Sequence, residues 1–344
     1  MKAAILKEIE KLEIEEIKIP EPKETEILIK VKSCAVCGTD IKVYHYGHKH
    51  IVFPRVTGHE LSGIIVKVGK NVEGYKEGDK VVVAPAIPCG RCYYCRKGQQ
   101  TMCDNLKAIG YHYDGGFAEY MLIPENAVLN GCVNKIPDNL SFEIACLAEP
   151  LACVINGQDL SGIETGDIVL ILGAGPIGIL HALLAKINGA GKIILADTSS
   201  ERIDEAKFAD CILLDMNKVE IYEEVKKITD GHMADKVIVA VGNKQAQEIS
   251  LKLVAKRGSI NFFGGLPKES PYIQFDSNLL HYGEFFVVGT HGSTPLQNRI
   301  AIELLSSKRI NVEKIITHKL PLEKIKEGFE IVESKKGLKV LILP

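Results

Sequence analysis

The first 150 residues of the chain alternate short apolar segments with turns rich in Gly, Pro, Asn and Asp. Such alternation is typical of half-buried strands joined by tight turns. From Glu8 to Lys32, Lys and Glu alternate with Ile and Val, which indicates strands with one solvated face rather than a charged tail. The pattern therefore predicts a β-rich, barrel-like domain. Its expected strands are Glu26–Val31, Gly63–Val68, Lys80–Val83 and Phe117–Ile123.

From about Leu151 the pattern changes to near-continuous apolar runs separated by helical segments. This alternation is typical of a doubly wound parallel sheet, because its strands are buried on both faces. Strands are expected at Ile168–Leu172, Lys192–Ala196, Lys236–Val241, Ser259–Phe263 and Phe285–Val288, and helices at Ile177–Asn188 and Ser200–Phe208. The tail, with a helix at Pro295–Ser307 and a strand at Lys335–Leu343, is expected to return to the first domain. We therefore expect an α/β protein with one domain formed by residues 1–150 and 290–344 and another formed by residues 151–289.

Length and charge limit the class of protein. A chain of 344 residues is expected to form two domains. Its 42 basic and 44 acidic side chains are interspersed, so it has no electrostatic footprint for nucleic acid or an acidic membrane. Ten cysteines without a signal peptide indicate a reducing, cytoplasmic location. The longest apolar stretch, Ile168 to Ala185, contains glycines, a proline and a histidine, and is interpreted as strand, turn and helix rather than a membrane span.

A glycine motif, Gly173-Ala-Gly175-Pro-Ile-Gly178, lies between an expected strand and an expected helix. In dinucleotide-binding sheets the first glycine permits a tight turn, the second lets the backbone approach a pyrophosphate, and the third allows close helix–strand packing. The pyrophosphate rests on the unpaired N–H groups of the helix N-terminus. Asp197 ends the next expected strand, where it can accept both ribose hydroxyls and repel a 2′-phosphate. The motif therefore predicts NAD rather than NADP; the alternative is a strand, turn and helix without a ligand.

Further residues are expected to line the same crevice. An arginine near the ribose can hold a 2′-phosphate, but the Asp197 carboxylate is expected to occupy that place in spite of Arg202. The ends of later strands face the cofactor in open α/β sheets, although a strand-end glycine is also common without any ligand. In addition to the three glycines of the motif, the expected cofactor-binding residues are Pro176, Ile177, Asp197, Arg202, Val241, Gly242, Gly264, Leu266 and Thr290.

Four cysteines, Cys89, Cys92, Cys95 and Cys103, fall within fifteen residues. Four thiolates at this spacing are typical of a closed tetrahedral zinc site. A bacterial ferredoxin-type cluster expects a last gap of three residues followed by Cys-Pro, whereas the gap here is seven. Two disulfides would need an oxidising compartment. A closed site has no open position for a substrate, so the spacing predicts a structural zinc.

Three other fragments carry residues suited to an open zinc site: Cys37-Gly-Thr-Asp40, Gly58-His-Glu60 and Glu149-Pro150. Each alone has an ordinary interpretation as a buried thiol, a surface histidine or a helix end, and spacing alone does not assemble them. In this order, together with the four cysteines and the glycine motif, they resemble the zinc-dependent medium-chain alcohol and polyol dehydrogenases over essentially the whole chain. The Glu-Pro variant resembles the sorbitol (L-iditol) and threonine dehydrogenase branch.

The resemblance implies a GroES-like catalytic domain, a Rossmann domain, and a catalytic zinc held by Cys37, His59 and one or both of Glu60 and Glu149. One thiolate and one carboxylate give a site of about zero net charge, and a second ligating carboxylate would make a poorer Lewis acid. We therefore expect the two glutamates not to bind tightly together at rest. The resemblance also implies that Thr39 passes on the proton of the alcohol.

The sequence departs from the family at two places. Where the family commonly has a histidine five residues after the zinc cysteine, this chain has Lys42, so the onward proton relay is expected at His45; the alternative there is a loop histidine in solvent. Sorbitol dehydrogenases tend to have a substrate-binding arginine shortly after the position of Gly289, and this chain has none there. An anionic substrate such as a sugar phosphate could instead meet Lys42, Lys49 and His50, or these residues form a solvated basic loop.

We therefore expect a cytoplasmic homodimer or homotetramer that contains two zinc ions per subunit and binds NAD. It is expected to oxidise a secondary alcohol of a polyol or sugar-derived substrate to a ketone, with hydride transfer to NAD. The enzymatic alternatives are an L-threonine 3-dehydrogenase-like enzyme and a sugar-alcohol-phosphate dehydrogenase. The alternative from another class is a nucleotide-binding protein that has lost catalysis. No nucleic-acid or membrane partner is expected.

Overall fold

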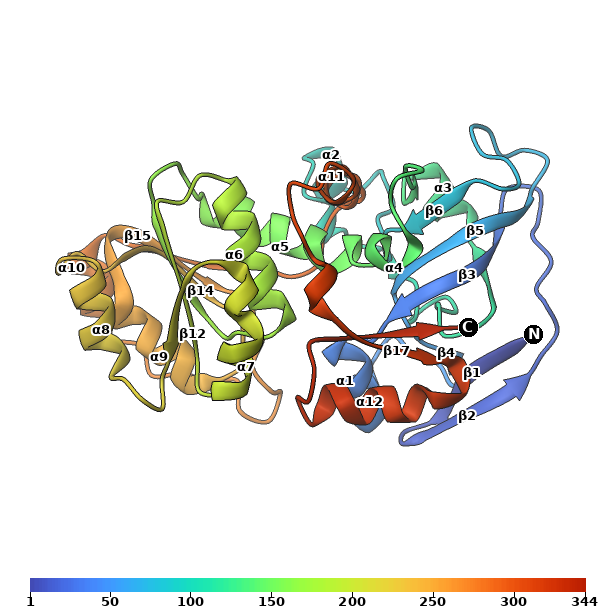
Figure 1. The fold of residues 1–344 in the computed structure, drawn as a ribbon. Helices are drawn as coiled ribbons and strands as arrows, with labels where there is room; N and C mark the ends of the chain where they lie inside the picture. Colours follow the sequence, from blue (N-terminus) through green and yellow to red (C-terminus); the bar gives the residue numbers. More distant parts are fainter. The chain divides into compact units, whose positions relative to one another are not determined.

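The computed structural model describes all 344 residues, which form two compact units (Figure 1). Unit 1 combines Met1–Ala152 with Gly292–Pro344, and unit 2 is the continuous segment Cys153–His291. Unit 1 thus takes its residues from both ends of the chain. The α/β fold class expected from the sequence is confirmed.

A barrel-like sheet forms the frame of unit 1. Its strands follow the order β10-β6-β5-β3-β18-β17, and β9 also pairs with β3. Alternating apolar residues of β3, Ile27, Ile29 and Val31, are fully buried and anchor the core of the unit. The strands are β3 (Ile27–Ala35), β5 (Glu60–Val68), β6 (Lys80–Val83), β9 (Tyr120–Ile123), β10 (Val133–Lys135), β17 (Ile316–Pro321) and β18 (Lys339–Leu343). A smaller sheet contains β1 (Lys2–Glu8), β2 (Lys11–Glu16) and β4 (Arg55–Val56).

The C-terminal tail completes this barrel. Strand β18 pairs antiparallel with β3, with Leu341 opposite Ala35, and parallel with β17. Helix α12 (Ile325–Glu333) packs on both β17 and β18. The strand expected at Lys335–Leu343 is therefore observed, beginning four residues later. Its insertion beside β3 brings Lys339 to the segment that carries Cys37.

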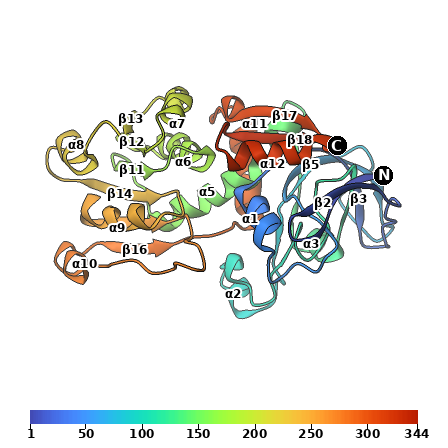
Figure 2. The same cartoon turned by 90° about the horizontal axis from the view of Figure 1, so that it is seen from below.

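Short elements connect the barrel strands. Helix α1 (Gly38–Tyr46) follows β3 directly, and α11 (Pro295–Ser306) begins at a capping box in which Thr294 and Gln297 exchange hydrogen bonds. Figure 2 shows α2 at the edge of unit 1, away from the barrel strands. The other elements are β7 (Ala86–Ile87), α2 (Tyr93–Arg96), η1 (Gln100–Met102), β8 (Lys107–Ala108), α3 (Glu125–Leu129), α4 (Phe142–Ala145), η3 (Glu313–Ile315) and η4 (Leu322–Lys324). Helix α5 (Ala148–Ser161) contains the boundary between the two units.

Unit 2 is a parallel sheet in the order β13-β12-β11-β14-β15-β16, visible edge to edge in Figure 2. Helices α6 and α7 lie on one side of this sheet and α8 and α9 on the other (Figures 1 and 2). The strands are β11 (Ile168–Leu172), β12 (Lys192–Asp197), β13 (Ile212–Asp215), β14 (Ala234–Val239), β15 (Val254–Phe262) and β16 (Phe286–Gly289). The helices are α6 (Pro176–Ile187), α7 (Ser200–Glu205), η2 (Ala206–Ala209), α8 (Ile221–Ile228), α9 (Lys244–Leu253) and α10 (Ser277–Gly283).

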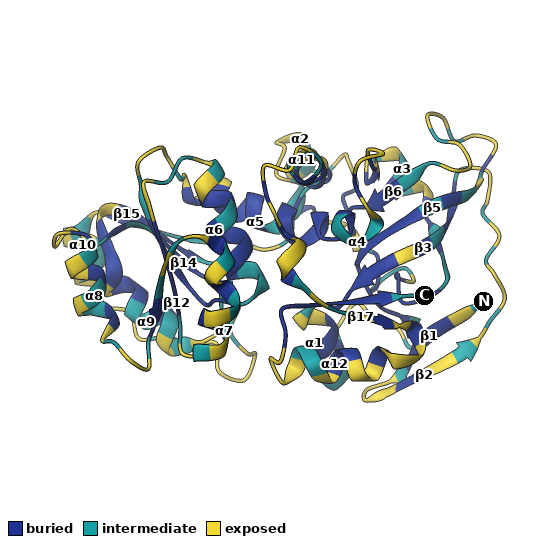
Figure 3. Ribbon diagram, in the orientation of Figure 1, coloured by how far each residue is buried: buried dark blue, intermediate teal, exposed yellow.

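Burial explains why the two halves of the sequence have different patterns. Strands β11 and β14 are covered on both faces, and their central residues are fully buried (Figure 3). Strand β2, by contrast, exposes most of its charged residues, as the alternating Lys/Glu pattern predicted. The apolar stretch Ile168 to Ala185 forms β11, a turn and most of α6. No helix in the structure combines the length and the apolar character that crossing a membrane requires.

Candidate active site

Cys37 lies at the N-terminus of α1, directly after β3 ends. Its backbone N–H donates to Asp40 Oδ2 at 2.9 Å, which fixes the first turn of the helix. The sulfur therefore lies at the positive end of the helix dipole. Thr39 Oγ1 lies 3.5 Å from Cys37 Sγ, so the Thr39 hydroxyl is in contact with the sulfur.

His59 reaches the same place through a turn that requires glycine. Gly58 has a φ of +91°, and a Cβ there would lie 2.8 Å from Cys34 Sγ and 2.9 Å from the ring of Phe117. The turn directs the buried His59 side chain towards Cys37 immediately before β5 begins. The glycine at position 58 thus permits the backbone turn that orients His59.

Asp40 orients the ring of His59. Its Oδ1 lies 3.4 Å from His59 Nδ1, longer than an ordinary hydrogen bond, while its Oδ2 holds the Cys37 backbone. A carboxylate on one ring nitrogen fixes a histidine for ligation through the other. Burial lowers the pKa of His59, but Asp40 and Cys37 raise it by more, so the pKa lies well above its usual range. The pocket therefore favours a cation between these groups.

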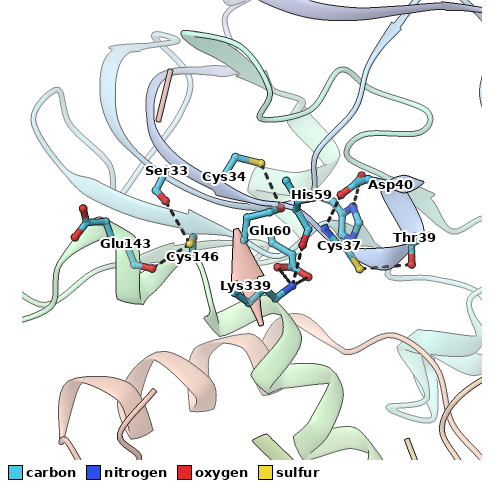
Figure 4. A network of polar contacts seen from close by, with 12 residues as sticks. Ser33, Cys34, Cys37, Thr39, Asp40, His59, Glu60, Glu143, Cys146 and Lys339 are labelled. Carbon is cyan, nitrogen blue, oxygen red and sulfur yellow. Dashed lines mark hydrogen bonds and ion pairs between the residues drawn. The ribbon is translucent and has the colours of Figure 1, made fainter. Parts of the chain in front are cut away.

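One ligand atom from each of Cys37, His59 and Glu60 lies within 4.8 Å of the other two. Figure 4 shows these side chains converging from α1 and the start of β5. A thiolate, an imidazole and a carboxylate are ligands that zinc accepts in proteins. The residues therefore fit a zinc ion, with room in a four-coordinate shell for one more ligand.

The structure adds a residue that the sequence had not indicated, Lys339. Its Nζ donates to both carboxylate oxygens of Glu60, at 2.5 Å to Oε1, and to the carbonyl of Val36 at 3.4 Å (Figure 4). Only 4% of Lys339 and 1% of Glu60 are exposed. Burial lowers the pKa of Lys339, but the negative charges of Glu60, Cys37 and Glu149 raise it above its ordinary value. Lys339 is therefore a permanent cation that neutralises Glu60.

Glu149 lies in the first turn of α5 and is also buried. Its carboxylate is outside the group of three ligand atoms that lie within 4.8 Å of one another. Its charge nevertheless acts on both Lys339 and Tyr111. Tyr111, a second residue missed by the sequence analysis, lies with its ring centroid 6.0 Å from that of His59, and burial raises the pKa of its hydroxyl.

His45 lies near the other end of α1, and carboxylates contact both of its ring nitrogens. Glu10 is 2.8 Å from Nδ1 and Glu333 is 3.0 Å from Nε2. The Glu10 hydrogen bond and the Glu333 charge raise the pKa of His45, although burial works against them. Since these nitrogens face carboxylates rather than Thr39, the arrangement does not support the proton relay expected at His45.

The four cysteines of the predicted structural zinc site also converge. Ligand atoms of Cys89, Cys92, Cys95 and Cys103 all lie within 4.8 Å of one another. None of the ten cysteines of the chain forms a disulfide. Backbone N–H groups of Arg91 and Cys92 lower the pKa of Cys89 to about 6, which favours its thiolate. The loop therefore presents a compact tetrathiol set in the arrangement that structural zinc requires.

In unit 2 the glycine motif joins β11 to α6, with Gly175 at the N-cap and Pro176 and Ile177 in the first turn. A Cβ on Gly178 would lie 1.7 Å from the carbonyl oxygen of Gly173, so only glycine permits this close packing. Strands β11 and β14 are neighbours although β12 and β13 intervene in sequence, which places the motif at the point where strand order reverses. Ligands of open α/β sheets bind at such a point.

Asp197 ends β12, the strand next to β11. Its Oδ2 accepts a hydrogen bond from Ala174 N at 2.7 Å and its Oδ1 accepts one from Ser199 N at 2.8 Å. The carboxylate is therefore fixed beside the glycine turn. Arg202 is also close, because a Cβ on Gly175 would lie 2.6 Å from an Arg202 guanidinium nitrogen. The structure thus brings together the two side chains expected to compete over cofactor choice.

The other residues expected at the cofactor follow the carboxyl ends of β14, β15 and β16. A Cβ on Gly264 would lie 2.3 Å from the Val241 backbone, and one on Gly242 would lie 2.4 Å from the Gly265 carbonyl oxygen, so these two turns pack backbone to backbone. Thr290 Oγ1 donates to the buried Asn261 side chain at 3.0 Å. Leu266 lies in the loop after β15, four residues beyond the last residue of the strand.

Comparison with known proteins agrees with both halves of the structure. Residues 23–138 match the alcohol dehydrogenase GroES-like domain, and residues 176–307 match the zinc-binding dehydrogenase family. The chain is 36% identical to an L-threonine 3-dehydrogenase of Pyrococcus abyssi, covering 96% of this chain and 94% of the relative. It is 32% identical to a sorbitol dehydrogenase of Halalkalibacterium halodurans, covering 94% and 93%. The structure of a zinc-binding dehydrogenase of Sinorhizobium meliloti 1021 bound to NADP superposes with a TM-score of 0.93 at 31% identity, covering 100% of this chain and 99% of the other.

The chain belongs to the zinc-dependent medium-chain dehydrogenases, with a GroES-like domain and a Rossmann domain. It is therefore an oxidoreductase of a family that uses zinc and a nicotinamide cofactor.

Proposed function

We propose that this protein oxidises a secondary alcohol of a polyol or sugar-derived substrate to a ketone and transfers the hydride to NAD. The observation that carries the proposal is the convergence of Cys37, His59 and Glu60 within 4.8 Å, with the Thr39 hydroxyl beside the sulfur. When bound, zinc lowers the proton affinity of an alcohol oxygen, and the nicotinamide accepts the hydride.

Charge bears on the choice between the two glutamates. Lys339 neutralises Glu60, so Glu60 contributes little net negative charge to the centre. Glu149 is also buried, and its charge acts on Lys339 from outside the group of converging ligand atoms. We infer that Cys37 and His59 hold the resting zinc with one of the two glutamates as the third ligand. Asp40 keeps the His59 ring oriented for ligation.

We propose that Thr39 moves the proton of the alcohol. Its hydroxyl can accept the proton of the substrate and donate its own onward, and it lies 3.5 Å from Cys37 Sγ. Since His45 faces Glu10 and Glu333, we propose that the proton leaves Thr39 by a route other than His45.

Cofactor choice depends on Asp197. Its carboxylate is fixed by two backbone N–H groups beside the glycine turn, so a 2′-phosphate would meet a negative charge that cannot easily move away. We therefore propose NAD as the preferred cofactor. Arg202 is the residue that would permit residual use of NADP.

Threonine oxidation is the second candidate, because L-threonine 3-dehydrogenases are among the relatives. A spectrophotometric screen of NADH formation with polyols, sugar phosphates, inositols and L-threonine tests the proposal. Turnover of polyols or their derivatives is expected. Turnover of L-threonine alone would select the second candidate, and the absence of zinc-dependent turnover with every substrate would leave a nucleotide-binding protein without catalysis.

A further inference from the structure

A buried amide, Asn261, lies within the parallel sheet of unit 2. It belongs to β15, where it is opposite Val288 of β16, and it is fully buried. Burial of an amide is costly unless its polar atoms find hydrogen-bond partners. The partners of Asn261 therefore show which parts of the unit it holds together.

The amide nitrogen of Asn261 binds helix α5. Nδ2 donates to the carbonyl of Gly157 at 2.8 Å and to Ser161 Oγ at 2.9 Å, and Ser161 Oγ donates to the same carbonyl at 2.7 Å. A carbonyl oxygen can only accept, so the amide nitrogen must face α5 and Oδ1 is left for another donor. The orientation of the amide is thus determined by its partners.

The end of α5 is fixed to the same strand by a second contact. Ser259 Oγ donates at 2.8 Å to the carbonyl of Ser161, which is one of the last four carbonyls of the helix and has no partner within it. A Cβ on Gly157 would lie 2.9 Å from the ring of Phe263, so the helix packs closely against the residue that follows β15. Helix α5 is therefore a firm support for Asn261.

The amide oxygen of Asn261 holds the segment that follows β16. Thr290 Oγ1 donates to it at 3.0 Å. Thr290 is half-buried, whereas Gly289 and His291 on either side of it are exposed. A longer bond, 3.4 Å, connects the carbonyl of His291 to Asn156 of α5. The Thr290 hydroxyl thus ties an otherwise exposed segment to the buried amide.

The place of this segment in the sheet indicates which half of the cofactor it meets. Asp197 at the end of β12 is expected to hold the adenosine ribose, and the Gly173 turn after β11 the pyrophosphate. The strand order continues from β11 through β14 and β15 to β16. The other half of the dinucleotide, which carries the nicotinamide, therefore extends towards β16 and the segment 289–291.

We propose that Asn261 is a positioning residue for the nicotinamide. Through Thr290 it holds the segment 289–291 in the conformation that receives this end of the cofactor. An amide suits the place because it accepts from Thr290 and donates twice towards α5, whereas a carboxylate has no hydrogen to donate. Order in the segment before binding reduces the entropy that the cofactor must offset. The inference rests on the nicotinamide cofactor of the proposed function and is independent of the substrate.

Calorimetric titration of the zinc-loaded protein with NADH and with ADP-ribose tests the proposal. ADP-ribose contains both riboses and the pyrophosphate but lacks the nicotinamide. Thr290→Val keeps the side-chain volume and removes the hydroxyl. It should weaken NADH binding about fivefold or more, because loss of a typical hydrogen bond lowers the population of the ordered segment by about that factor. The dissociation constant of ADP-ribose should change less than about twofold.

Two further variants separate the hydroxyl from a general effect of the substitution. Thr290→Ser keeps the hydroxyl and should bind NADH as the wild-type protein does. The matched control is Thr165→Val, which changes an exposed threonine three residues before β11 and should leave the binding of both ligands unchanged.

The amide itself is tested by Asn261→Leu, which should weaken NADH binding with the same selectivity. Addition of Thr290→Val to Asn261→Leu should cause no further loss, since the two side chains act as one unit. Thr290→Val leaves the bonds between Asn261 and α5 in place, so the test does not depend on the folding of Asn261→Leu.

Unchanged NADH binding in Thr290→Val would overturn the inference and leave the proposed function standing. Equal weakening of NADH and ADP-ribose, or a further loss in the double variant, would have the same consequence. Failure of the wild-type protein to bind NADH would remove the nicotinamide cofactor of the proposed function and this inference together.

Discussion

Replacement of Lys339 by methionine tests the charge balance of the metal centre. Methionine has a similar length and no charge, so it removes the partner of Glu60 while it fills most of the space. Glu60 is 1% exposed, and both of its carboxylate oxygens accept from Lys339. Removal of one partner of a buried ion pair costs about 3–5 kcal/mol, because the remaining charge is left uncompensated.

The expected loss in thermal stability follows from the size of the unit. For a unit of 150–250 residues each kcal/mol shifts the midpoint by about 2–4 °C, so metal-free Lys339→Met should unfold roughly 6–20 °C lower. Differential scanning calorimetry of the metal-free protein measures this shift. Added zinc should restore more stability to the variant than to the wild-type protein, since the unpaired Glu60 carboxylate gains a new cationic partner.

Two controls distinguish the buried pair from a general effect of losing a lysine. Lys319 lies in the same C-terminal tail as Lys339 and forms an exposed ion pair with Glu143. Lys319→Met removes this pair and should lower the free energy of unfolding by less than about 1 kcal/mol. Lys339→Met combined with Glu60→Gln should recover much of the stability, because no buried charge remains. The reasoning would be refuted if Lys339→Met were no less stable than Lys319→Met, or if the double variant were no more stable than Lys339→Met alone.

Three further predictions concern the proton, the cofactor and acid stability. Thr39→Val should lower kcat about 10²–10⁴-fold without changing the zinc content, and Thr39→Ser should retain most activity; equal activity of Thr39→Val would remove its role. Asp197→Asn should raise the ratio of kcat/KM for NADP to that for NAD tenfold or more. An unchanged ratio would show that residues other than Asp197 determine the cofactor preference. Burial lowers the pKa of His181 to about 3, whereas the unfolded value is about 6.5, so stability is full at pH 7 and falls as the unfolded state takes up a proton below pH 6.5. Urea unfolding of the wild-type protein should therefore lose about 3 kcal/mol more than His181→Leu between pH 7 and pH 4, and parallel losses would contradict this.

Much of the fold could be predicted because hydrophobic periodicity reports burial directly. Strand β11 has the predicted bounds, and β12 and the helix α6 agree to within one residue. The expected helix Ser200–Phe208 is instead α7 followed by the 3₁₀ turn η2. Helix α1 was not predicted, because its nine residues combine polar and β-branched side chains without a clear apolar face.

The candidate site was harder to assemble, since its parts come from distant segments. Nothing in the spacing of Cys37 and His59 requires them to meet; β3, the Gly58 turn and β5 bring them together. Lys339 was missed because it begins an apolar strand and resembles an ordinary strand-end lysine. The sequence did contain an indication of this role. A lysine in a strand buried in a barrel core is shielded from solvent, so its charge requires a buried acidic partner. Binding of zinc, cofactor and substrate by the residues named here stays a prediction.

The most direct test of the metal centre is the zinc content of each subunit, measured by native mass spectrometry. The wild-type protein should contain two zinc ions per chain, and Cys37→Ser should contain one, because only the site of Cys37 and His59 is lost while the four-cysteine site remains. The folded Cys37→Ser protein should show no alcohol oxidation. Two zinc ions in Cys37→Ser, or full activity of this variant, would contradict the account.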